Sequence, residues 1–257
     1  MEKDVQTAVK TFSTGIQLQL LQSQGLTARQ AMALALPINF DKHILFNPYI
    51  NYSYYLAPCF LAMMLLIFTV LLTVYAIGTE LKFGSAREWL DTADGSIMAA
   101  LLGKMLPTTI AMSIMAMVMY VVVFKVMGAP MNGSAAMLIL SALVFVISYQ
   151  AIGIFFIAVF DNLRLALSFG GGYSVLAFTF SGLTFPIMAM YPAMQWFSYL
   201  FPFTFYMRIY VDIAMRGAPT MFAMADLACM LLFQIPAIVT MPRLKKLCSD
   251  EKYWGKL

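Results

Sequence analysis

Five long stretches of this 257-residue chain carry almost no charge, and they constrain its fold more than any other feature. They cover approximately residues 55–78, 105–127, 135–160, 165–188 and 221–241. An α-helix of about 20 apolar residues crosses the ~30 Å hydrocarbon core of a bilayer. Only 11% of the residues are charged, against about 25% in a soluble domain, so five such helices would lack a polar shell in water. We therefore predict an all-α membrane protein, a polytopic helical bundle with about five transmembrane helices.

Three regions follow from this pattern. Residues 53–241 form the predicted transmembrane domain, and residues 242–257 form a basic tail. Residues 1–52 contain too little apolar material for a core of their own, and we interpret them as the remnant of an extracytoplasmic domain. Within them, apolar spacing predicts an amphipathic helix over 4–23, a second helix that Thr27 and Gln30 open as a capping box, and a short strand and turn over 40–50.

Basic residues indicate the orientation, because they accumulate in loops on the cytoplasmic side. Nine of the 16 Lys and Arg residues lie in segments 79–104, 161–164 and 242–257, and three lie near the opposite loops. The nine are Lys82, Arg87, Lys104, Arg164, Arg243, Lys245, Lys246, Lys252 and Lys256. We predict an N-terminus outside and a cytoplasmic C-terminus. About 50 residues would then cross the membrane with no signal peptide or span before them, which favours a missing upstream segment.

The predicted cytoplasmic loop 79–104 contains a short helix. Ser85 and Glu88 fit an S-x-x-E capping box, which predicts a helix from Ala86 to about Thr92 with a polar and an apolar side. Gly95 then breaks the helix. Two interpretations stay open: an interfacial helix at the inner membrane surface, or a docking surface for a cytoplasmic partner.

The segment over residues 189–218 is rich in proline and aromatic residues. Such a composition at a membrane interface predicts short helices that dip into the bilayer without crossing it, a short reentrant outer segment. Arg208, Asp212 and Arg216 follow one another at four-residue spacing. On one helix face they would form a local ladder of ion pairs.

Several motifs, taken in order, resemble those of the ABC-2 type permeases, the membrane subunits of ATP-driven exporters. The resemblance covers about residue 40 to the C-terminus and is strongest to multidrug-type permeases with a large external domain. The motifs are Ile44–Pro48, Pro58, Glu80, Gly84-Ser85, Ala86–Thr92, Gly103-Lys104, Pro107, Gly182–Pro186, Tyr191-Pro192, Gln195-Trp196, Phe201-Pro202, Arg208 and Gly217. The chain departs from the family in having Asp94 where a proline is usual. It also has five spans instead of six, which favours a truncated or split gene product.

The resemblance implies a bacterial inner-membrane permease that moves a drug-like, lipid-like or other amphipathic substrate outward. It implies a second permease subunit, surrounding membrane lipid, a cytoplasmic ABC ATPase and, for a split gene, a separate N-terminal half. The ATPase-coupling loop would contain Glu80, Gly84, Ser85, Arg87, Glu88, Trp89 and Asp91. The reentrant outer segment would contain Pro186, Pro192, Trp196, Pro202, Arg208, Asp212 and Arg216.

Other functional classes have weaker support. The chain lacks the G-x-x-x-x-G-K-[ST] phosphate-binding motif, so we expect no bound cofactor, with ATP and Mg on the partner. A single histidine, His43, and three scattered cysteines predict no metal site. The sequence has no dense run of basic residues, so it does not predict nucleic-acid binding. An intramembrane enzyme would depend on Asp226, the only acid inside a predicted span. A non-transporting scaffold or an inactive permease fragment stays open as the alternative.

Overall fold

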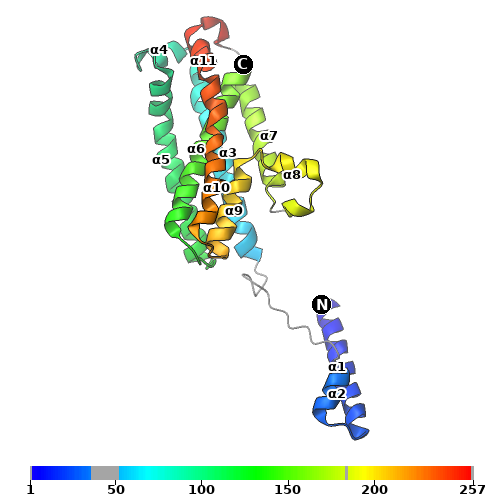
Figure 1. Cartoon of the computed structure of the whole chain (residues 1–257). Helices are drawn as coiled ribbons and strands as arrows, with labels where there is room; N and C mark the ends of the chain where they lie inside the picture. The colour runs from blue at the N-terminus through cyan, green and yellow to red at the C-terminus, as the bar shows by residue number, and fades with distance from the viewer. Residues whose placement is uncertain (1, 36–51, 183–184, 256–257) are drawn as a thin grey trace. The chain divides into compact units, whose positions relative to one another are not determined.

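A computed structural model describes residues 2–35, 52–182 and 185–255 (Figure 1). The strand and turn expected over residues 40–50 lie outside these described residues. The chain divides into two compact units, Met1–Pro48 and Tyr49–Leu257. Throughout the described ranges the regular elements are helices, and the prediction of an all-α polytopic protein is confirmed.

The first unit is a pair of helices, α1 (Glu2–Ser23) and α2 (Ala28–Ala35). Gly25 ends α1 with a φ of +87°, a conformation that glycine adopts without a steric cost. The Oε1 atom of Gln30 accepts hydrogen bonds from the backbone N–H of Thr27 at 3.2 Å and from its hydroxyl at 2.8 Å. The Gln30 half of the expected capping box is therefore present.

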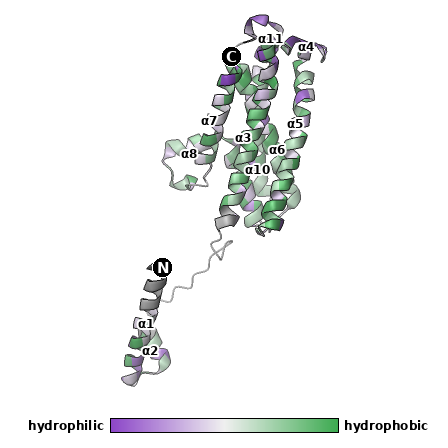
Figure 2. Cartoon of the chain, turned by 180° about the vertical axis from the view of Figure 1, so that it is seen from behind, coloured by the Kyte–Doolittle hydropathy of each residue, from purple (hydrophilic) through white to green (hydrophobic). Residues whose placement is uncertain are grey.

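The second unit is a bundle of spanning helices joined by short ones. Its elements are α3 (Tyr52–Phe83), α4 (Ala86–Asp91), α5 (Ile97–Val121) with the π-helix η1 (Val122–Val126), α6 (Ala135–Phe160), α7 (Leu163–Phe180), η2 (Ile187–Ala189), α8 (Pro192–Ser198), α9 (Pro202–Tyr210) with the π-helix η3 (Val211–Met215), α10 (Thr220–Leu232), α11 (Gln234–Ser249) and η4 (Glu251–Tyr253). Among the described residues, five helical segments are long and apolar enough to cross a membrane. Figure 2 shows hydrophobic residues along the bundle and hydrophilic ones near α4.

The spans differ from the sequence prediction mainly at their ends. The second helix begins at Ile97, ten residues before Pro107, which lies inside it. The fourth ends at Phe180 instead of residue 188, and Gly182 follows with a φ of +88°. The last continues to Ser249 as α10 and α11, so half of the predicted basic tail is helical.

The α6 helix is the centre of the bundle, with α3, α5, α7, α9, α10 and α11 packed around it. Small residues allow close approach: a Cβ atom on Gly153 would lie 2.8 Å from Thr73 of α3. Polar side chains join the helices, as when the Ser148 hydroxyl donates to the Met230 carbonyl of α10 at 2.9 Å. Such small-residue contacts and interhelical hydrogen bonds hold helices together where lipid removes the hydrophobic driving force.

The short helix α9 lies beside the first half of α6. At its start, the Phe203 N–H donates to the hydroxyl of Tyr149, near the middle of α6, at 3.1 Å. At the end of η3, the Ala214 carbonyl accepts from the N–H of Asn132, just before α6 begins, at 2.9 Å. The 14 residues of α9 and η3 span only about 20 Å. The α9–η3 segment therefore reaches from the middle of the bundle to one end without crossing it.

Candidate functional site

A partly buried cluster of polar and charged side chains joins α3, α4 and α5 at one end of the bundle. We call this end, which contains α4, the α4 end. The Glu80 carboxylate, near the end of α3, accepts hydrogen bonds from the Ser85 hydroxyl and the Lys104 ammonium of α5. Lys104 also lies over the Trp89 ring of α4, 5.1 Å from its centroid. The Glu80 and Lys104 side chains are only about one-fifth exposed, so water screens this pair less than a surface pair. We call Glu80, Ser85, Trp89 and Lys104 the Glu80 cluster.

The corner before α4 differs from the predicted capping box. Gly84 turns the chain with a φ of +77°, and Ser85 precedes the helix. The Ser85 side chain makes no cap hydrogen bond to α4, because its hydroxyl donates to Glu80 instead. Glu88 lies exposed on the helix. The capping-box prediction is therefore wrong, although α4 forms at the predicted place and ends one residue early, at Asp91.

The α4 helix has one packed side and one open side. Ala86 and Leu90 are buried against the bundle, whereas Arg87, Glu88 and Asp91 are exposed. Arg87 and Asp91 approach to 4.0 Å, but an exposed pair of this kind contributes little to stability. The exposed charges are therefore available to another molecule, while the apolar side and the Glu80 cluster fix α4 to the spans.

The turn after α4 explains one departure from the family pattern. Asp94 has a φ of +52° and Gly95 a φ of +71°. Proline cannot occupy the first of these positions in this conformation, because its ring holds φ near −65°. The turn leads into Ser96, whose hydroxyl accepts from the Ala99 N–H and caps α5. Asp94 therefore marks a left-handed turn that a proline-containing loop would have to build differently.

The C-terminal segment is part of the same surface, which the sequence did not predict. The Trp254 indole donates to the Leu247 carbonyl at 3.1 Å, and the Gly255 N–H donates to the Leu81 carbonyl of α3 at 3.2 Å. The ring of Trp254 lies against Gly84. An open groove runs between α4 and η4, and it is lined by Gly84, Arg87, Glu88, Asp91, Thr92, Glu251 and Trp254.

A second charged site joins α9 to α10. The Arg208 guanidinium lies 3.4 Å from the carboxylate of Asp226, which is 7% exposed. The predicted ladder is therefore wrong in its first step, because Arg208 pairs with α10 and not with Asp212. The π-helical turn at Val211–Met215 explains this, since its wider turn breaks the four-residue register. Only Arg216 and Asp212 form the predicted local pair, at 2.8 Å.

The remaining residues of the predicted outer segment lie on separate elements. Pro192 and Pro202 begin α8 and α9, where a missing N–H costs nothing. Pro186 and Trp196 are exposed on the η2–α8 side, and Figure 1 shows α8 projecting away from α10. Pro202 and the three charged residues therefore lie on or directly after the α9–η3 segment, whereas the other predicted residues lie at the start of η2 and in α8. Within the described ranges, no group of three His, Cys, Asp or Glu side chains could hold a metal ion.

These features define a polytopic helical membrane protein with a helical loop fixed across two spans and a short helix inserted beside α10. The family described as ABC-2 family transporter protein matches residues 2–240, and the chain belongs to this family. The match includes α1 and α2, so it extends further towards the N-terminus than the motifs in the sequence indicated. Comparisons with curated proteins and with solved structures find no match. Membership makes the chain a permease subunit of an ABC transporter, which associates with an ABC ATPase and a permease partner.

Proposed function

We propose that this permease exports a drug-like, lipid-like or other amphipathic substrate, driven by ATP hydrolysis on a separate subunit that docks at the α4 end. The observation that carries the proposal is the Glu80 cluster. It fixes α4 to both α3 and α5, and it leaves the polar side of α4 open. A partner that binds this side acts on two spanning helices together.

The coupling follows from differential binding. A transporter with two access states shifts towards whichever state its partner binds more tightly. An ATPase that changes shape between its nucleotide states would bind α4 in a different position in each. Because Glu80 links the end of α3 to the start of α5, displacement of α4 would move those helix ends and change the access of the substrate path.

The proposed topology places the α4 end in the cytoplasm of a bacterial cell and the N-terminus outside the inner membrane. The supporting observation is the concentration of Lys and Arg residues in the segments that the structure brings to this end. Two permease chains, identical or different, would surround one path, and ATP and Mg would bind only to the ATPase subunits.

The coupling proposal is tested by Glu80→Gln, with Asp94→Asn as the matched control. Both variants remove one acid from residues 79–104, but Asp94 lies outside the Glu80 cluster, and asparagine tolerates its positive φ. In proteoliposomes with the co-purified ATPase, we expect Glu80→Gln to retain ATP hydrolysis and to lose most of the transport that depends on it. Asp94→Asn should transport normally. Full transport by a folded Glu80→Gln variant, or failure of any ATPase to co-purify, would contradict the proposal.

The topology is tested with single cysteines at Arg87 and Met131, introduced after Cys59, Cys229 and Cys248 are replaced by serine. Both positions are exposed. Arg87 lies on α4, and Met131 lies in the connection between η1 and α6, which is at the other end of the bundle (Figure 1). A membrane-impermeant maleimide added to intact spheroplasts should label position 131 and spare position 87. The reverse result would invert the topology and remove α4 from the reach of a cytoplasmic ATPase.

A further inference from the structure

The last span is attached to the turn before α4 by residues 250–255, a connection that the coupling proposed above does not use. After α11 the chain turns back through η4, where the Asp250 carboxylate accepts from the Lys252 N–H at 3.1 Å. The Trp254 indole then donates to the Leu247 carbonyl, in the last turn of α11, at 3.1 Å. We call residues 250–255 the C-terminal clasp. These bonds fix the clasp to the end of the last span.

A second set of contacts fixes the clasp to the corner between α3 and α4. The Gly255 N–H donates at 3.2 Å to the carbonyl of Leu81, which lies in the last turn of α3. The last four carbonyls of a helix have no partner within it, so the clasp supplies one of the missing donors. At the same corner, a Cβ atom on Gly84 would lie 3.6 Å from the Trp254 ring. Trp254 therefore joins the end of α11 to the turn that leads into α4.

The α11 helix itself also packs against α4. Leu247 of α11 is buried, as are Ala86 and Leu90 on the inner side of α4. Two different sets of contacts thus hold α4: the Glu80 cluster connects it to α3 and α5, whereas apolar packing and the clasp connect it to α11. The open groove at this end has walls from both α4 and the clasp. A partner that fills the groove therefore contacts both.

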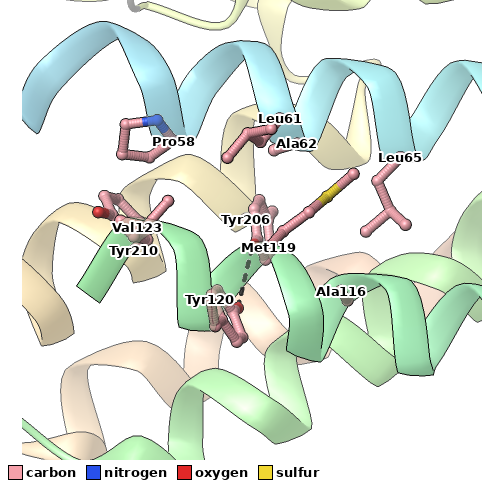
Figure 3. Close-up of a pocket in the computed structure, with 10 residues that line it drawn as sticks. All are labelled: Pro58, Leu61, Ala62, Leu65, Ala116, Met119, Tyr120, Val123, Tyr206 and Tyr210. Atoms are coloured by element: carbon pink, nitrogen blue, oxygen red, sulfur yellow. Dashed lines mark hydrogen bonds between the residues drawn. The ribbon is translucent and has the colours of Figure 1, made fainter. Parts of the chain in front are cut away.

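Both sets of contacts lead, through spanning helices, to α9. The Glu80 cluster holds α5, whose Tyr120 hydroxyl lies 2.9 Å from the Tyr206 hydroxyl of α9 (Figure 3). These two helices and α3 leave a cavity of only about 20 Å³ beside this pair, so the junction is closely packed. The clasp holds α11, and α10 continues this span to Asp226, which pairs with Arg208 of α9. The two connections therefore meet at α9.

The last span is a continuous element that can carry a displacement along the bundle. Its two helices form one membrane-spanning segment of 30 residues, Thr220–Ser249, with a length of about 45 Å. Phe233 joins them with a φ of −68° and a ψ of −5°, which keeps the backbone in a right-handed helical conformation. Rigid helices and packed side chains are the elements that transmit coupling between distant sites. A shift of α11 at the α4 end would therefore reach α10.

We propose that the C-terminal clasp makes the last span follow α4, with Trp254 as the positioning residue, so that α9 is displaced through α5 and α10 together. This inference rests on the proposed docking of an ATPase at the α4 end, and it adds a second connection to the one through Glu80. Without the clasp, the ATPase would still dock and would still move α3 and α5. The last span would no longer follow, and ATP hydrolysis would continue with less transport per ATP.

The test uses the complex of this chain with its ATPase in proteoliposomes and needs no transported substrate. Two single cysteines are introduced separately into the chain without its native cysteines: Thr220→Cys at the start of α10, and Val126→Cys at the end of η1, which continues α5. Both positions are exposed. The labelling rate with a fluorescent maleimide is measured without nucleotide and with ATP, Mg and vanadate. In the parent complex we expect each rate to change about fivefold or more, as for coupling at the low end of the usual range.

In Trp254→Ala we expect the response at position 220 to disappear, the response at position 126 to remain and ATP hydrolysis to continue. A variant that only weakened the fold would lower both responses together. Lys252→Ala replaces an exposed side chain of the same turn and should keep both responses. A chain that ends at Ser249 lacks the whole clasp and should behave as Trp254→Ala does, so the test does not depend on one variant.

A response at position 220 that persists in both clasp variants would overturn the proposal, as would its loss together with the response at position 126. Glu80→Gln distinguishes this failure from a failure of the proposed function, because it should remove the response at position 126. A persistent response at position 220, beside a Glu80→Gln variant that behaves as expected, would overturn the clasp alone. Absence of any response in the parent complex would contradict the proposed function, and the clasp with it.

Discussion

Two neighbouring spans, α6 and α5, are alike in length and hydropathy but differ in how deeply they are buried in the bundle. Over its most apolar window, α6 has 72% of its residues buried, whereas the α5–η1 span has 11%. Both are long, nearly uncharged and almost without amphipathic character. Six helices pack around α6, while α5 contacts mainly α3 and α6. Apolar length therefore predicts that a segment crosses the membrane, but it does not predict its place in the bundle.

Side-chain size explains part of the difference. The α6 helix buries small residues, such as Ala142 and Gly153, against its neighbours, and aliphatic and aromatic side chains, such as Ile157 and Phe145, fill the space between them. The α5 helix exposes a stripe of large aliphatic side chains at Leu102, Leu106, Ile110, Ile114, Val118 and Val121. Lipid accommodates such side chains, whereas a close helix neighbour requires small ones. If this comparison holds, matched substitutions should be costly in α6 and nearly neutral in α5.

The largest expected difference is between Phe145→Ala in α6 and Ile114→Ala in α5. Phe145 is fully buried, with ring centroids 4.8 Å from Tyr149 and 4.3 Å from Tyr206. Its truncation leaves a cavity and should lower the free energy of unfolding by about 3–5 kcal/mol. Ile114 is 59% exposed, so its truncation should cost well under 1 kcal/mol. Reversible unfolding in mixed micelles measures both values, and similar costs would break the comparison.

A glycine pair tests close packing directly. A Cβ atom on Gly153 would lie 2.8 Å from Thr73 and 3.1 Å from the Val70 carbonyl, whereas Gly103 of α5 has nothing within 4 Å. Gly103→Ala should raise helix stability by up to about 1 kcal/mol, because alanine is the better helix former. In Gly153→Ala the clash outweighs this gain, and we expect a loss of about 1–3 kcal/mol. Thermal unfolding midpoints that shift in the same direction would contradict the packing argument.

The two ion pairs near α9 sharpen the comparison for charges. Arg208→Ala leaves the buried carboxylate of Asp226 without its partner, and this should lower the free energy of unfolding by about 1–3 kcal/mol. Arg216→Ala removes a pair whose arginine is more than half exposed, and it should cost less than about 1 kcal/mol. Asp226→Asn in the Arg208→Ala background should recover part of the loss. Equal costs for the two arginine variants would show that Asp226 is not effectively buried.

The sequence predicted the five spans because uncharged length is a local property. It also placed α4 correctly, since Gly84, Ser85 and Gly95 limit that helix from both sides. It missed the contacts of Glu80 and Arg208, because Lys104 and Asp226 are distant in sequence and only the packing of the spans brings them close. The ladder prediction failed because a π-helical turn shifts the register without any proline or glycine to mark it.

The smallest expected effect concerns the hydrogen bonds that join α5 to α6. The Thr109 hydroxyl of α5 donates to the Gln150 carbonyl oxygen of α6 at 2.8 Å, and the Gln150 amide approaches the Met105 carbonyl at 3.4 Å. Interhelical hydrogen bonds in membranes contribute on average about 0.6 kcal/mol. Thr109→Val should therefore destabilise the bundle only slightly.

The same variant should loosen α5 selectively, because this bond is one of few polar links between α5 and the rest of the bundle. Hydrogen exchange should become faster in α5 near Thr109 and stay unchanged in α6, where the surrounding helices maintain protection. Thr108→Val, one position away on α5, is the control for the change in side-chain type. Equal acceleration in both helices would mean that α5 is part of the same cooperative core as α6, and that its exposed surface does not reflect weaker attachment.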